Sequence, residues 1–126
     1  MAFVLNQSQS YSWPVSIQLP ADGGKRQKSS FDALFKRLPQ SRINEIQQLA
    51  QQRIKAAERG EELDNGVTDQ TIAAEILVGW AGILDADGDD VPYSEAVKAQ
   101  LLDVPMMAGA LIEAYFTSLV ELKRKN

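Results

Sequence analysis

Trp13-Pro14-Val15-Ser16-Ile17-Gln18-Leu19, followed by Pro20-Ala21-Asp22-Gly23-Gly24, predicts a β-hairpin near the start of the chain. Large apolar residues alternate with small or polar ones from Trp13 to Leu19, a period of two that is typical of a strand with one buried face. Pro14 cannot donate a backbone hydrogen bond, so we expect the strand to begin there or to lie at a sheet edge. Asp22-Gly23 supplies the positive φ that a hairpin turn requires.

Two patterns compete in the segment that follows the polar, basic stretch 25–30. Phe31, Ala33 and Phe35 alternate as in a strand. Phe31, Leu34, Phe35 and Leu38 fit helical spacing equally well. We choose the strand that continues out of the hairpin, and Pro39 ends it.

Helical spacing dominates from residue 41 onward, where Ser41 is the expected N-cap of a helix that Gly60 ends. Its apolar stripe consists of Ile43, Ile46, Leu49, Ala50, Ile54 and Ala57, and the opposite face, rich in Gln, Arg and Lys, is expected to face solvent. An acidic loop is expected over residues 61–66.

Three further helices are predicted. The first begins at Thr68 or Asp69 and carries Ile72, Ile76 and Trp80 on one face. Its Gly79 and Gly82 indicate a fraying end or a close backbone approach. A short helix begins at Ser94. The last is a central core helix that Pro105 can start and that runs to about Lys123.

The predicted fold class is α+β, mainly α, with an N-terminal β-hairpin packed on a bundle of about four helices. The 126 residues suffice for one domain. We expect an extended lead-in, able to be mobile, over residues 1–11, and a single domain over 12–126. That domain comprises a hairpin region (12–38) and a helical region (41–126).

Composition excludes several chemistries, because the chain has neither cysteine nor histidine. Disulfides, thiolate metal sites, cysteine nucleophiles and histidine relays are therefore impossible. Glu75, Glu113 and Glu121 come nearest to apolar faces, where capping or surface ion pairs are the preferred roles. We predict no catalytic residue, no cofactor and no metal site.

The acidic turn from Asp85 to Asp90 has only the beginning of an EF-hand pattern. Asp85, Asp87 and Asp89 fit ligand positions 1, 3 and 5, but position 6 is Asp90 instead of glycine, and Glu95 comes one residue early for position 12. We interpret the segment as an acidic turn, and weak calcium binding stays open. Gly23-Gly24-Lys25 lacks the frame of a phosphate-binding loop.

Charge is strongly segregated behind the net value of −4. Residues 1–59 carry +5, residues 60–105 carry −10 and residues 106–126 carry +1. Solvated faces are the favoured interpretation; a two-faced protein that stacks or docks a charged partner is the alternative. The candidate partner-binding residues are Lys25, Arg26, Lys28, Lys36, Arg37, Asp85, Asp87, Asp89 and Asp90.

The start of the chain lacks the basic and apolar pattern of a signal peptide, and no apolar run approaches the length of a membrane span. A soluble intracellular protein is expected, without a membrane partner. Basic residues near Phe31 and Phe35 raise the alternative of nucleic-acid binding, but buried aromatics beneath a solvated edge are preferred, so no nucleic-acid partner is predicted.

Taken in order, several short motifs resemble the tail assembly chaperones of long-tailed bacteriophages and prophages. They are Tyr11-Ser12-Trp13-Pro14-Val15, Pro20 to Lys25, Phe31 to Pro39, Gly79-Trp80 with Gly82, Asp85, Asp87 and Gly88, Val91 to Ser94, Leu101-Leu102 with Pro105, and Ala114-Tyr115-Phe116. The resemblance implies a non-catalytic protein that binds the long, helical tape-measure protein and helps recruit the major tail protein. It also implies self-association, a place in the bacterial host cytoplasm, absence from the mature virion and, in many phages, a longer frameshifted form.

Other function classes remain as alternatives to this hypothesis. The first is a structural minor tail or tail completion protein. A small enzyme that uses carboxylates alone and a nucleic-acid binder that uses the basic N-terminal half are the others.

Overall fold

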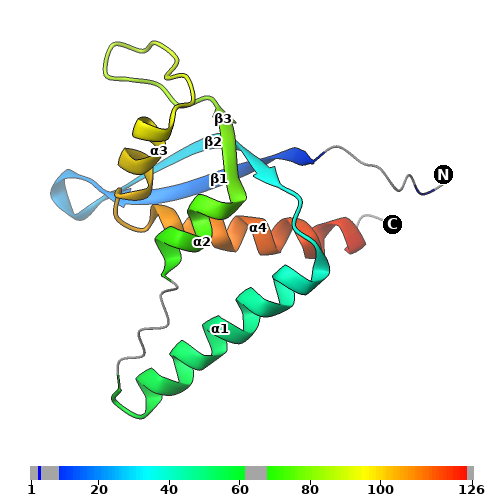
Figure 1. Cartoon of the computed structure of the whole chain (residues 1–126). Coiled ribbons are helices and arrows are strands. Elements are labelled where there is room, and N and C mark those ends of the chain that lie inside the picture. Colours follow the sequence, from blue (N-terminus) through cyan, green and yellow to red (C-terminus); the bar gives the residue numbers. More distant parts are fainter. Residues whose placement is uncertain (1–2, 4–8, 62–67, 125–126) are drawn as a thin grey trace.

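The structure is a computed structural model that describes residues 3, 9–61 and 68–124, with side chains as far as Val120. It is an α+β fold with a three-stranded antiparallel sheet and four helices, which confirms the predicted class (Figure 1). The strands are β1 (Ser10–Pro20), β2 (Arg26–Lys36) and β3 (Leu77–Ala81), and the helices are α1 (Gln40–Glu58), α2 (Asp69–Ile76), α3 (Glu95–Leu102) and α4 (Met107–Arg124).

The predicted hairpin is confirmed, including the choice of a strand over residues 31–36. β1 pairs with β2 along its whole length, from Ser10 opposite Lys36 to Pro20 opposite Arg26. A short 3₁₀ turn (Asp22–Gly24) closes it, with both glycines at positive φ. The sheet order is β1-β2-β3, so β1 lies at an edge, as Pro14 predicts.

The predicted helix from Thr68 through Trp80 is wrong in its second half. α2 ends at Ile76, and Leu77–Ala81 forms β3, which pairs antiparallel with residues 32–35 of β2. Gly79 makes this possible, because a Cβ there would lie 3.0 Å from a methyl carbon of Leu34. The glycine therefore marks a close backbone approach between strands, and pairing with β2 outweighs the helical spacing.

The predicted N-terminal residues are confirmed for two helices and wrong for the other two. Thr68 forms a capping box with Thr71, and the Ser94 hydroxyl accepts from the Val97 N–H at 3.1 Å. Ser41 is not a cap, because α1 begins one residue earlier after Pro39, whose fixed φ already suits a helix entry. Pro105 does not start α4, which begins at Met107 after a turn in which Met106 has φ 70°.

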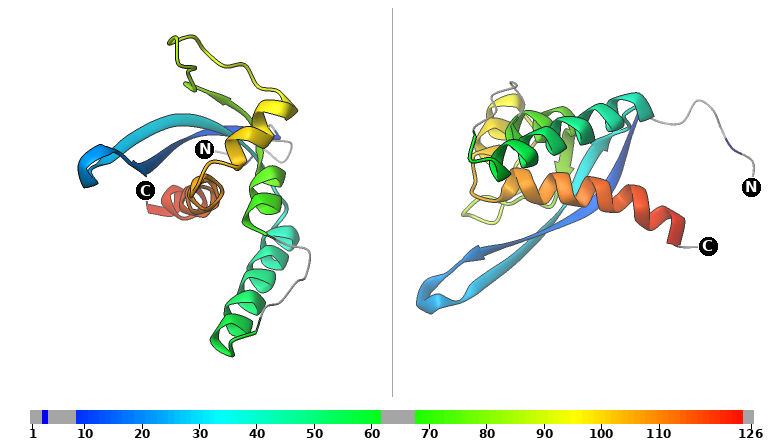
Figure 2. Two further views of the ribbon diagram at one scale, coloured as in Figure 1. Left: turned by 90° about the vertical axis from the view of Figure 1, so that its left-hand side faces the viewer. Right: turned by 90° about the horizontal axis from the view of Figure 1, so that it is seen from below.

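The core lies where α4 packs against β1 and α2, and the prediction of α4 as the central helix is confirmed. Its largest fully buried side chains come from both strands of the hairpin, the α2–β3 junction and α4: Val15, Phe35, Ile76, Leu77, Leu111 and Tyr115. Figure 2 shows α4 running beneath the hairpin while α1 extends away from the sheet. The fold thus has one compact part and one projecting helix.

Parts of three predicted segments lie outside the described residues. They are most of the lead-in over residues 1–11, most of the acidic loop over residues 61–66, and Lys125 at the C-terminus. Within residues 9–61 and 68–124, no helix combines the length and apolar character that a membrane crossing requires.

Candidate partner-binding surfaces

The predicted basic hairpin surface is divided by the fold into two separate groups. Lys25, Arg26 and Lys28 lie at the hairpin tip, whereas Lys36 and Arg37 lie at the opposite end of β2. Eight residues of strand separate Lys28 from Lys36, which is roughly 27 Å. All five side chains are exposed. The five basic residues therefore form two separate groups instead of one continuous basic patch.

Arg37 at the hairpin base is held by the protein's own aromatic residues. Its guanidinium carbon lies 4.8 Å from the centre of the Tyr11 ring, a cation–π contact. Tyr11 and Tyr115 stack at 6.4 Å, and Phe35 meets Tyr115 edge-on at 5.2 Å. Burial raises the pKa of Tyr11, against opposing effects of the Ser118 hydrogen bond and the Arg37 charge. Arg37 thus packs against the aromatic residues at this end of the hairpin.

The hairpin tip carries positive charge with few internal contacts. In the part of the chain that the structure describes, none of Lys25, Arg26 and Lys28 forms an ion pair. Asp22 is the one acidic residue in the turn beside them. The tip is therefore a small, exposed basic surface at the end of a hairpin arm.

The acidic turn between β3 and α3 is organised by its first carboxylate. An oxygen of Asp85 accepts hydrogen bonds from the N–H groups of Asp87 at 2.9 Å and Asp89 at 3.0 Å. The Asp85 N–H in turn donates to the Asp89 carbonyl at 2.9 Å. Asp85, Asp87, Asp89 and Asp90 are exposed. Among the described residues, no group of three acidic side chains is placed to hold a metal ion.

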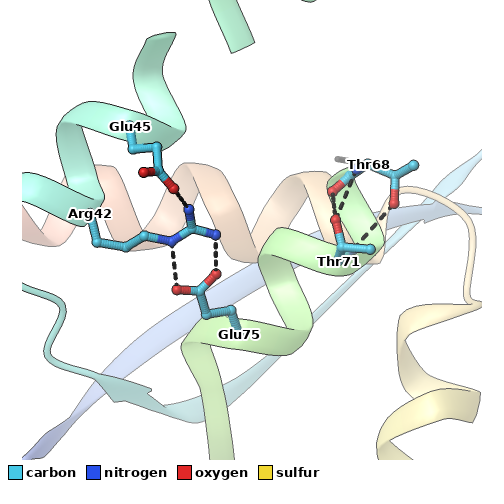
Figure 3. A network of polar contacts seen from close by, with 5 residues as sticks. All are labelled: Arg42, Glu45, Thr68, Thr71 and Glu75. Atoms are coloured by element: carbon cyan, nitrogen blue, oxygen red, sulfur yellow. Dashed lines mark hydrogen bonds and ion pairs between the residues drawn. The ribbon is translucent and has the colours of Figure 1, made fainter. Parts of the chain in front are cut away.

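An ion-pair network joins the beginning of α1 to α2 (Figure 3). The Arg42 guanidinium donates to both carboxylate oxygens of Glu75, at 2.8 and 2.6 Å, and also contacts Glu45. The hydrogen bonds from Arg42 lower the pKa of Glu75, and its charge acts in the same direction, against the effect of burial. The same pairing raises the pKa of Arg42. The predicted ion-pair role of Glu75 is confirmed.

The apolar stripe of α1 leaves the protein body halfway along the helix. Ile43 and Ile46 are 8% and 3% exposed, whereas Ile54 is 53% exposed, and Ala50 and Ala57 are also exposed. All five residues fall on one face at helical spacing. The stripe is therefore buried in its first half and exposed in its second half, where Ala56, which lies outside the stripe, is 2% exposed. A helix of 19 residues is about 28 Å long, more than so small a core can cover.

The family model described as YdaY prophage protein matches residues 32–116, about two thirds of the chain. The match begins within β2 and ends within α4, so it includes α1, the acidic turn and most of the core. No curated protein and no solved structure matches the chain.

Proposed function

The chain belongs to the YdaY prophage protein family, and we propose that this prophage-associated protein is a tail assembly chaperone. In this proposal it is non-catalytic, binds the tape-measure protein in the host cytoplasm, assists assembly of the tail tube and does not remain in the virion. Support comes from the order of its sequence motifs and from the prophage family. The major tail protein is a further proposed partner, and self-association is proposed as well.

The exposed half of the α1 stripe is the observation that carries the proposal. Ala50, Ile54 and Ala57 continue the face that Ile43 and Ile46 bury inside the protein. An apolar stripe about one helix wide, with two small residues beside one large one, suits close packing by another helix. A long helical protein such as the tape-measure protein offers many amphipathic helices of this kind. Covering them would keep it soluble before assembly.

Charge supplies a second contribution to docking in this proposal. The basic tip (Lys25, Arg26 and Lys28) and the acidic turn (Asp85, Asp87, Asp89 and Asp90) lie on different parts of the molecule. Opposite charges at separate places would orient a partner or a second copy without adding much affinity. Lys36 and Arg37 would contribute at the hairpin base.

The test is co-expression with the tape-measure protein encoded by the same prophage, followed by purification of the complex. We expect the wild-type chain to increase the soluble fraction of the tape-measure protein and to co-purify with it. Ile54→Glu places a charge in the exposed stripe and should reduce co-purification at least tenfold. Gln52→Glu adds the same charge to the opposite face of α1 and should leave co-purification unchanged.

Equal solubility of the tape-measure protein with and without this chain, and no co-purification, would contradict the proposal. Mass spectrometry of purified virions addresses the alternative of a structural minor tail or tail completion protein. A fixed stoichiometry in the finished particle would favour that alternative, because a chaperone leaves after assembly.

A further inference from the structure

β1 has one open edge, and its backbone groups there can be assigned from the pairing with β2. The Arg37 N–H donates to the Gln9 carbonyl, and the Ala21 N–H donates to the Lys25 carbonyl, both at 2.8 Å. Both hydrogen-bonded positions in the β1 arm are odd-numbered. Antiparallel pairs alternate, so the even-numbered residues of β1 direct their N–H and C=O groups away from β2. Ser16 and Gln18 therefore present donors and acceptors to the open edge.

Two prolines limit how much of this edge can pair. Pro14 and Pro20 occupy even-numbered positions, where their missing N–H groups would have pointed outward. A regular ladder is thus confined to the stretch between them, around Ser16 and Gln18. This arrangement disfavours open-ended strand addition while leaving room for a short strand.

A hollow lies beside this stretch, between β1 and α4. It has a volume of about 670 Å³ and is bordered by Ser16, Ile17, Gln18 and the first turns of α4. A smaller hollow of about 240 Å³ continues along Trp13 and Pro14, and the two share Ser16, Ala110 and Glu113. We call this combined feature the β1–α4 trough.

The residues of α4 that line the β1–α4 trough include several with small side chains. Gly109, Ala110 and Ala114 face the strand, and a Cβ built on Gly109 would meet nothing within 4 Å. A backbone can therefore approach the strand without colliding with long side chains. At one end stands Met106, which is 65% exposed and supplies a flexible apolar contact.

More acidic than basic residues line the trough. Asp69, Asp103 and Glu113 line it against one basic residue, Arg26. Asp69 lies 3.9 Å from Arg53 of α1, which leaves Asp103 and Glu113 as the acidic lining residues that form no ion pair within the described part of the chain. The trough is therefore complementary to a positively charged segment.

We propose that the β1–α4 trough binds a short, extended, basic segment of a partner protein by strand addition to β1. The segment's backbone pairs with Ser16 and Gln18, its apolar side chains contact Met106, and its lysine or arginine side chains pair with Asp103 and Glu113. This surface is separate from the exposed α1 stripe, so the inference does not depend on the proposed function.

The test uses two peptides of about seven residues, one alternating lysine with valine and the other alternating glutamate with valine. We expect the lysine peptide to bind the full chain and to shift and protect the Ser16 and Gln18 amides in NMR spectra. The glutamate peptide should bind at least tenfold more weakly, since it repels Asp103 and Glu113. Equal binding of both peptides, or amide shifts confined to other strands, would overturn the proposal.

Ser16→Pro is the decisive variant, because it removes one outward N–H from β1, as Pro14 already does. We expect at least tenfold weaker peptide binding, which corresponds to loss of one hydrogen bond, whereas Ser16→Ala keeps the donor and should bind normally. If Ser16→Pro fails to fold, a lysine peptide N-methylated at alternate residues tests the same bonds from the other side. A change in sedimentation of Ser16→Pro without peptide would show that a second copy occupies the edge, which would also overturn the proposal.

Discussion

α1 and α4 are helices of nearly equal length with opposite relations to the core. α1 has 19 residues and α4 has 18, and each carries apolar residues on one face. Met107, Leu111 and Tyr115 of α4 are at most 5% exposed, while the α1 stripe is buried only at Ile43 and Ile46. The difference teaches that amphipathic spacing predicts a helix but does not predict how much of its stripe the same chain covers.

The neighbours of the two helices explain this difference. α4 packs against β1, α2 and α3, so its stripe is covered over several turns. α1 is joined to the body mainly near its beginning, where Arg42 pairs with Glu75 of α2. In its second half Ala56 is 2% exposed and Arg53 lies 3.9 Å from Asp69 of α2, but Ala50, Ile54 and Ala57 of the stripe remain exposed.

The largest expected effect comes from truncating a stripe residue in each helix. Leu111 is fully buried, so Leu111→Ala should lower the free energy of unfolding by about 2–5 kcal/mol through lost burial and a cavity. Ile54→Ala should change it by less than about 0.5 kcal/mol, because half of that side chain is exposed and alanine favours helix. Urea unfolding followed by circular dichroism measures both. Equal losses would show that the outer half of α1 is part of the core.

A smaller effect is expected from the contact that fastens α4 to the end of β2. The Tyr115 hydroxyl donates to the Lys36 carbonyl at 3.0 Å and accepts from the Leu38 N–H at 3.2 Å. Tyr115→Phe leaves both backbone groups without this partner and should lower the free energy of unfolding by about 1–3 kcal/mol.

Tyr93→Phe is the matched control, since Tyr93 is 37% exposed and packs on Trp80 mainly by its ring. It should stay within about 0.5 kcal/mol of wild type. A Tyr115→Phe variant as stable as this control would mean that ring packing alone holds α4 to the sheet.

Sequence patterns were sufficient for the parts of this fold that depend on local chemistry. The alternation from Trp13 to Leu19, the Asp-Gly turn and the caps at Thr68 and Ser94 are all set by residues near one another. β3 could not be predicted in this way, because residues 72–80 fit helical spacing and the strand exists only through pairing with β2. The separation of Lys28 from Lys36 likewise depends on the uninterrupted length of β2.

The smallest expected effect concerns the tether that keeps α1 against the body. Since Arg42 lowers the folded-state pKa of Glu75, the ion pair contributes fully above the unfolded-state pKa of about 4.3. That contribution is lost as the pH falls through the lower folded-state pKa of Glu75.

The contribution of this ion pair to stability should be at most about 1 kcal/mol, because both side chains are more than a quarter exposed. Glu75→Gln should therefore destabilise the protein at pH 7 and approach wild-type stability as the pH falls below the folded-state pKa of Glu75. Urea unfolding at decreasing pH from 7 measures this convergence. Glu113→Gln, on the exposed surface of α4, is the control and should match wild type at pH 7. A constant difference between Glu75→Gln and wild type at every pH would mean that the charge of Glu75 does not hold α1, and that its other contacts, such as the burial of Ile43 and Ile46, do so.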